Sequence, residues 1–259
     1  MSSGKATRSI GPLIFGAGLA AAGLAALVFG DFGAGQTVPT TFPARTTLAY
    51  SAGALILISG LALEWHRTVA WGAAILTSYY TVFGVLLMNG RLLLKGYASY
   101  GTYENIAMQL AIASTGLIIY ATTAQLRISA AMRLKRFGRT AFGVCSLIWG
   151  GAHFVYMDMT APLVPKWLPP GQVFWGCLTG VCFIAAGLAI VTGIQARPAA
   201  VLLTVMIGAF GLLANGPMLI ANPASKFNWT ESLLNLVLTG ATWVVADSLA
   251  RSSPDLISL

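Results

Sequence analysis

The sequence is poor in charged residues. Only 8% of its 259 residues are charged, whereas soluble domains carry roughly a quarter. Such a chain cannot cover a water-facing surface, which excludes a soluble enzyme, a disordered chain and a nucleic-acid-binding module. Three cysteines are present, and none forms a CxxC pair, so we expect neither a disulfide framework nor a thiolate metal site.

Sequence signatures of known catalytic sites are also missing. The chain has no nucleotide-binding loop, no GxSxG and no HExxH. Its two histidines, His66 and His153, are predicted to lie on opposite sides of a membrane, which argues against a haem held by two histidines. We therefore expect no metal and no haem.

Hydrophobic residues, by contrast, make up 57% of the chain, and the mean hydropathy is +0.78. A helix needs about 20 apolar residues to cross the hydrocarbon of a bilayer. Eight runs approach or exceed this length: 10–30, 46–64, 69–94, 104–124, 138–157, 172–193, 198–221 and 231–250. The sequence therefore predicts an all-α integral membrane protein with eight transmembrane helices and the lipid bilayer as its partner.

Positive charge predicts the orientation of these spans. An even number of spans places both termini on one side, and ten Lys and Arg residues fall on that side: Lys5, Arg8, Arg67, Arg127, Arg133, Lys135, Arg136, Arg139, Arg197 and Arg251. Five fall on the other side: Arg45, Arg91, Lys95, Lys166 and Lys226. Because positive loops stay in the cytoplasm, both termini are predicted to be cytoplasmic. The densest basic stretch, 127–139, fits a topology anchor or a contact with lipid headgroups or a partner.

The two halves of the sequence resemble each other. An offset of 127 residues aligns Pro43 with Pro170, Gly53 with Gly180, Phe83-Gly84 with Phe210-Gly211 and Glu104 with Glu231. Near "FGVLLMNG" and "FGLLANG" one residue is gained, which pairs Asn89 with Asn215. In the first spans an offset of 122 aligns Phe15-Gly16 with Phe137-Gly138 and Phe32 with Phe154. Asp31 and His153 are then predicted to occupy equivalent places.

Four spans in each copy give both copies the same orientation, so the repeat is parallel. We predict two four-helix bundles: a first repeat at 1–126, a basic cytoplasmic linker at 127–137 and a second repeat at 138–259. Glycine and alanine on the helix faces would let the helices approach closely in lipid.

Candidate site residues lie at the predicted outer ends of the spans. Placing an ionisable group inside lipid costs free energy, so each such residue calls for a structural or a functional explanation. His153 lies in the apolar segment "LIWGGAHFVYMD" and needs a partner, either structural or functional. The other candidates, which are Glu231, Asn215 and the tryptophans Trp175 and Trp229, each have a structural alternative. Asn228 and Glu231 fit a capping box, the tryptophans fit an interfacial belt, and Asn215 fits a hydrogen bond beside a proline kink.

Residues 138–250 carry "FGVCSLIWGGAHFVYMD", "LVPKWLPPGQVFWGCLTGVCFIAAGLAI" and "NPASKFNWTESLLNLVLTGATWVVADSLA". These segments resemble the DoxX/DoxX-like family of small four-span bacterial membrane proteins. The family's first-span histidine falls on His153, and its final-span entry falls on Trp229 and Glu231. The first half shares the resemblance only through the repeat, since Asp31 replaces the histidine there.

The resemblance implies a location in the bacterial inner membrane. Some relatives are membrane subunits of thiosulfate:quinone oxidoreductases, while most have no established activity, so catalysis stays open. One hypothesis is a membrane subunit of a quinone-linked oxidoreductase, with a partner oxidoreductase subunit. His153 and Glu231 would handle protons, and Trp175, Asn215 and Trp229 would line the quinone slot. The alternatives are a non-catalytic scaffold for a partner complex and a permease for a small neutral solute.

Overall fold

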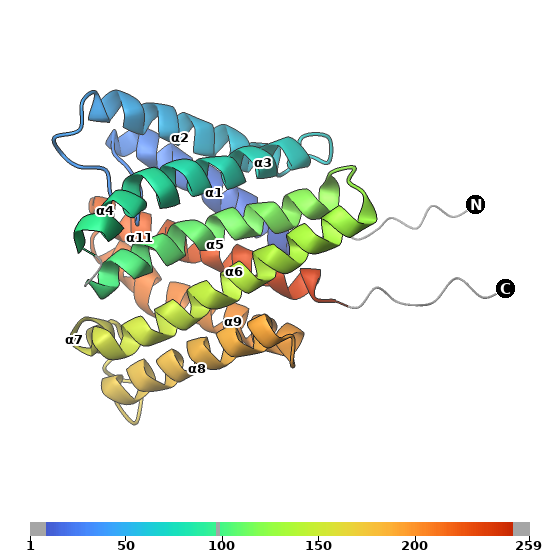
Figure 1. Ribbon diagram of the computed structural model, residues 1–259. Coiled ribbons are helices and arrows are strands. Elements are labelled where there is room, and N and C mark those ends of the chain that lie inside the picture. The colour runs from blue at the N-terminus through green and yellow to red at the C-terminus, as the bar shows by residue number, and fades with distance from the viewer. Residues whose placement is uncertain (1–8, 97–98, 251–259) are drawn as a thin grey trace.

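The computed structural model describes residues 9–96 and 99–250, and every regular element in this part of the chain is a helix (Figure 1). Lys5, Arg8 and Arg251, which contributed to the predicted orientation, lie outside the described residues. The long helices of the first half are α1 (Ile10–Phe29), α2 (Arg45–Ala62), α3 (Val69–Tyr79) and α5 (Tyr100–Thr123). Those of the second half are α6 (Ile128–Val155), α8 (Gln172–Thr192), α9 (Ala196–Phe210) and α11 (Lys226–Ser248).

Six helical segments within the described residues are long and apolar enough to cross a membrane. A seventh is added if α6 and the short helices at Met157–Leu163, which bend away from it by 88°, count as one span. The all-helical, multi-pass membrane character predicted from the sequence is therefore supported. The eighth predicted span, α11, is 23 residues long but too polar on average to be counted with the others.

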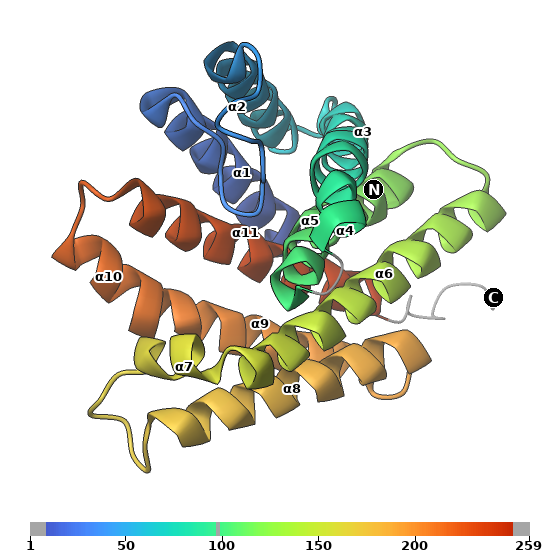
Figure 2. The ribbon, with the colours of Figure 1, turned by 60° about the vertical axis from the view of Figure 1, so that its left-hand side comes forward.

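The helices pack in the same order in the two halves. In the first, α1 packs on α2, α2 on α3, and α3 on α5; in the second, α6 packs on α8, α8 on α9, and α9 on α11. The first helix of each half also packs extensively on the last helix of the other half, α1 on α11 and α6 on α5. Figure 2 shows α11 between α1 and α9. This central position keeps much of α11 away from lipid, which accommodates its polar residues.

Glycines let the first two helices of each half approach closely. A Cβ atom added at Gly23 would lie 2.7 Å from the Gly53 carbonyl oxygen, and one added at Gly150 would lie 2.8 Å from that of Gly180. Further along the same helices, Gly16 meets Gly60, and Gly143 meets Gly187. All these pairs are related by an offset of 127 residues, as in the rest of the repeat.

The predicted offset of 122 in the first spans therefore disagrees with the helix contacts. At an offset of 127, Phe15 corresponds to Phe142, and both side chains are fully buried. Asp31 then corresponds to Asp158, and Ala26 corresponds to His153. The Phe-Gly pair at 137–138 matches the pair at 15–16 in sequence, but the pair at 142–143 makes the equivalent helix contact, because Gly143 meets Gly187 as Gly16 meets Gly60.

The third helix of each half widens into a π-helix, η1 (Tyr80–Asn89) and η3 (Gly211–Asn215), before continuing as α4 (Gly90–Gly96) and α10 (Gly216–Ala221). Both wide segments end at an Asn-Gly pair. A π-turn accommodates one extra residue, which agrees with the residue gained between the two copies at this place. Widened turns of this kind are frequent at functional sites.

The basic stretch after α5 is not a separate loop. Residues 128–137 form the first turns of α6, which continues without a break to Val155. The two halves are thus joined by a short connection between Thr123 and Ile128 and then by a continuous helix.

Candidate functional site

His153 lies in the last turn of α6. Its Nδ1 atom is 2.9 Å from the carbonyl oxygen of Trp149. Because a carbonyl only accepts hydrogen bonds, Nδ1 carries the proton and donates it. The ring lies beside Phe183 and Phe210, with ring centroids 5.2 and 6.5 Å away. No hydrogen bond to Nε2 is found within the described residues, so in the neutral ring this atom is an available acceptor.

The two candidate tryptophans use their indole N–H groups within the chain. Trp175 donates to the carbonyl oxygen of Pro169 at 2.9 Å, and Trp229 donates to that of Pro223 at 2.8 Å. Each bond fastens the start of a helix to the loop before it. These residues can offer ring faces to a ligand but not a hydrogen bond.

Asn215 and Glu231 lie on neighbouring elements, because the Ser232 hydroxyl donates to the carbonyl oxygen of Asn215 at 3.3 Å. The side-chain amide of Asn215 makes no hydrogen bond in the described part of the chain. Glu231 is half-buried and lies close enough to Glu104 for their charges to interact. Between His153 and Glu231, the described residues show no hydrogen bond.

The predicted capping box at Asn228 and Glu231 is wrong. Helix α11 begins three residues earlier than such a box requires, at Lys226, and Ser225 is its N-cap. The Ser225 hydroxyl accepts from the backbone N–H of Asn228 at 3.2 Å. Likewise, the N-cap of α5 is Ser99, and Glu104 is not part of a cap. Helix capping therefore does not account for either glutamate.

Asp31 links the two halves through ion pairs, and its position does not correspond to that of His153. Its carboxylate pairs with Arg45 of the first half at 2.5 Å and with Lys226 of the second half. Burial raises the pKa of Asp31, but hydrogen bonds from Lys226, the Phe32 backbone and Arg45 outweigh this effect, so the pKa is lowered below its ordinary value. The equivalent Asp158 is exposed and has no ion pair among the described residues.

A buried polar cluster in the first half was not predicted from the sequence. Asn89, fully buried, accepts from the Thr37 hydroxyl at 3.1 Å and donates to the carbonyl oxygens of Gly35 at 3.1 Å and Gly84 at 2.8 Å. These contacts draw the loop at 30–44 into the mouth of the first half, which is the end of its helices where Asn89 lies. The only sequence signal was the pairing of Asn89 with Asn215, which says nothing of the loop.

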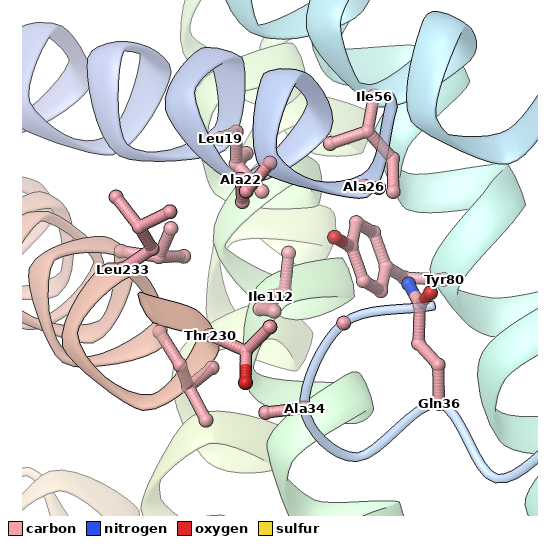
Figure 3. Close-up of a pocket in the computed structure, with 14 residues that line it drawn as sticks. Leu19, Ala22, Ala26, Ala34, Gln36, Ile56, Tyr80, Ile112, Thr230 and Leu233 are labelled. Atoms are coloured by element: carbon pink, nitrogen blue, oxygen red, sulfur yellow. The ribbon is translucent and has the colours of Figure 1, made fainter. Parts of the chain in front are cut away.

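Below this loop lies a cavity of about 40 Å³ (Figure 3). Tyr80 is 4% exposed and points its hydroxyl into the space, and the described residues provide no hydrogen bond for it. The cavity is lined mainly by small or aliphatic side chains: Leu19, Ala22, Ala25, Ala26, Gly33, Ala34, Gln36, Ile56, Tyr80, Ile112, Thr230, Leu233, Leu234 and Val237. At the 127-residue offset, Ala22, Ala26 and Ile56 correspond to aromatic residues of the second half: Trp149, His153 and Phe183.

Among the described residues, no group of three or more His, Cys, Asp and Glu side chains is placed to hold a metal ion. No family model, curated protein or solved structure matches this chain. The function is therefore inferred from the chemistry of individual side chains.

Proposed function

We propose that the chain crosses a bacterial inner membrane eight times, as two four-helix repeats of the same orientation, with both termini in the cytoplasm. The matching order of helix contacts and the constant 127-residue offset support the repeat. The central position of α11 supports it as an eighth span despite its polar residues. The excess of Lys and Arg on the side of the termini supports the orientation.

We further propose that the protein is a DoxX-like membrane subunit of a quinone-linked oxidoreductase. The observation that carries this proposal is His153, whose Nε2 has no hydrogen-bond partner in the described chain although the ring is surrounded by apolar side chains. A quinone ring needs an apolar slot and one hydrogen-bonding group. Phe183 and Phe210, which lie beside the imidazole and pack on each other, fit the first need, and Nε2 fits the second.

The hydrogen bond to Trp149 determines what His153 can do. With Nδ1 donating to that carbonyl oxygen, the neutral ring offers only a lone pair at Nε2. The ring can take a proton at Nε2 and, once positive, donate it again, so it acts as a proton relay. A quinone, when bound, would supply the two-electron chemistry, with the partner oxidoreductase subunit as the source or acceptor of the electrons. Glu231 exchanges the proton with water at the outer mouth, and Asn215, Trp175 and Trp229 line the slot.

The test is quinone-dependent turnover of the native complex carrying His153→Ala. We expect at least a tenfold loss, because general acid–base groups typically contribute two orders of magnitude or more. Quinone that co-purifies with the protein should fall as well. The matched control is His66→Ala, which removes the other histidine in the short turn between α2 and α3 and should change neither quantity. Unchanged turnover and unchanged bound quinone in His153→Ala would remove the site.

A further inference from the structure

The first turns of α6 carry positive charge that nothing nearby in the described chain neutralises. Arg133 and Arg136 are exposed, and both ion pairs among the described residues involve Asp31, at the opposite end of the helices. No acidic residue occurs between Arg127 and Tyr156. Arg139, one turn further on, already has hydrogen-bond partners within the chain, since its guanidinium donates to Ser248 at the end of α11.

Exposed apolar side chains are interleaved with these arginines. Met132 is 58% exposed and Phe137 is 65% exposed. Residues four apart lie on the same side of a helix, so Arg133 lies above Phe137, and Met132 lies above Arg136. Val144, two turns beyond Phe137, continues the exposed apolar strip along the helix. A surface with these properties matches the boundary between headgroups and acyl chains, and not a water-facing protein surface.

The length of α6 places the arginines at that boundary. Its 28 residues extend about 42 Å, which exceeds the roughly 30 Å of bilayer hydrocarbon. If the end at Val155 lies at one edge of the hydrocarbon, about 20 residues fill it, and Arg133 and Arg136 emerge at the other edge. Phe137 then lies among acyl chains, where a soluble partner does not reach it.

We propose that this surface, formed by Met132, Arg133, Arg136 and Phe137, binds the headgroup of an anionic phospholipid. Arg133 and Arg136, three residues apart, are close enough to contact one phosphate together, and planar guanidinium groups suit bidentate phosphate contacts. Met132 and Phe137 pack along the acyl chains. The proposal needs only that the chain lies in a bilayer, and it does not rest on the quinone site.

The test compares lipids retained by the full-length protein. Purified protein in neutral detergent is incubated with equal amounts of phosphatidylglycerol and phosphatidylcholine, separated from free lipid and analysed for bound lipid. The wild-type chain should retain at least fivefold more phosphatidylglycerol, and Arg133→Gln with Arg136→Gln should abolish the preference. High salt should weaken it. The matched control is Arg67→Gln with Arg197→Gln, which removes the same charge from the α2–α3 turn and from the first turn of α9 and should leave the preference intact.

Several results would overturn the proposal. The first is a wild-type chain that shows no preference for phosphatidylglycerol. The second is an equal loss of preference in both double variants, which indicates an effect of net charge. The third is a co-purifying protein that only the Arg133/Arg136 variant loses. If the glutamine variant does not fold, Arg133→Lys with Arg136→Lys keeps the charge without the planar group. That variant should retain part of the preference, and full loss or full retention would contradict a phosphate contact through guanidinium groups.

Discussion

The mouths of the two halves, at Asn89 and at Asn215, differ although the helices around them pack in the same order. In the first half, the loop at 30–44 enters the mouth, bonds to buried Asn89 and covers a small cavity lined by Ala22 and Ala26. In the second half, Trp149 and His153 occupy the corresponding positions, and the side chain of Asn215 makes no hydrogen bond in the described chain. One frame therefore supports a closed polar mouth in one copy and an aromatic mouth with an available histidine in the other.

The comparison separates residues that maintain the frame from those that distinguish the copies. The glycine pairs between the first two helices are present in both halves with similar spacing. Residues one to three helical turns nearer the mouth than these glycines differ between the two halves in size, polarity or partner, as Ala26 differs from His153 and Asp31 from Asp158. We therefore expect frame substitutions to act equally in the two halves and mouth substitutions to act in one half only.

The largest loss of stability is expected from substitutions of the paired glycines. A Cβ atom at Gly23 would lie 2.4 Å from the backbone nitrogen of Leu57, and one at Gly150 would lie 2.5 Å from Ile184 Cγ1. Because overpacking forces the helices apart, Gly23→Ala and Gly150→Ala should each reduce the free energy of unfolding by about 3 kcal/mol. Unfolding by SDS titration in mild detergent measures this.

Gly208→Ala is the control for both, since its added Cβ atom would meet nothing closer than 3.8 Å. A stable Gly150→Ala protein beside an unstable Gly23→Ala protein would show that the two frames are not equivalent.

A smaller effect is expected at the paired asparagines. Asn89→Ala removes three hydrogen bonds and leaves the buried Gly84 carbonyl without one of its partners, so it should cost about 2 kcal/mol. Asn215→Ala should change stability by less than about 0.5 kcal/mol. The same SDS titration compares them, and protease cleavage in the loop at 30–44 should increase only for Asn89→Ala. Equal losses would mean that both mouths are closed by their asparagine.

The smallest effect is expected at the paired aspartates. Asp31→Asn should destabilise the protein by about 1 kcal/mol or less at neutral pH, because ion pairs near a surface contribute little. The folded pKa of Asp31 is lowered below the ordinary 3.8, so its contribution is complete above that value and is lost as the pH falls through the folded pKa. Wild type and variant should therefore converge in acid.

Stability profiles between pH 2 and pH 8 measure the Asp31 effect, and Asp158→Asn serves as the control, with a profile like that of the wild type. Divergence of Asp31→Asn from the wild type on acidification would contradict the ion-pair account.

The sequence was sufficient to predict an all-helical, multi-pass membrane protein, because apolar runs of membrane length are a strong signal. The register of the first spans was predicted wrongly, since two Phe-Gly pairs five residues apart compete. The matching glycine contacts, Gly23 with Gly53 and Gly150 with Gly180, decide between them. Glycine spacing along both helices, read together, would have chosen the 127-residue offset.

The candidate site was less predictable. His153 was identified because a lone histidine in an apolar run needs a partner, but its bond to Trp149 depends on side-chain rotation, which composition does not reveal. The α11 cap was misassigned because Ser225 and Asn228 are both good cap residues. The Asn89 cluster and the cavity depend on where a loop folds, and no periodic pattern specifies that.

The exchange of helix contacts between the halves has a consequence for any attempt to divide the chain. Since α1 is buried against α11 and α6 against α5, neither group of four helices covers the flanks of its own outermost helices. A fragment cut between Thr123 and Ile128 would expose the flank of α5 that packs on α6 and the flank of α1 that packs on α11. The two fragments are therefore expected to be stable together and not apart.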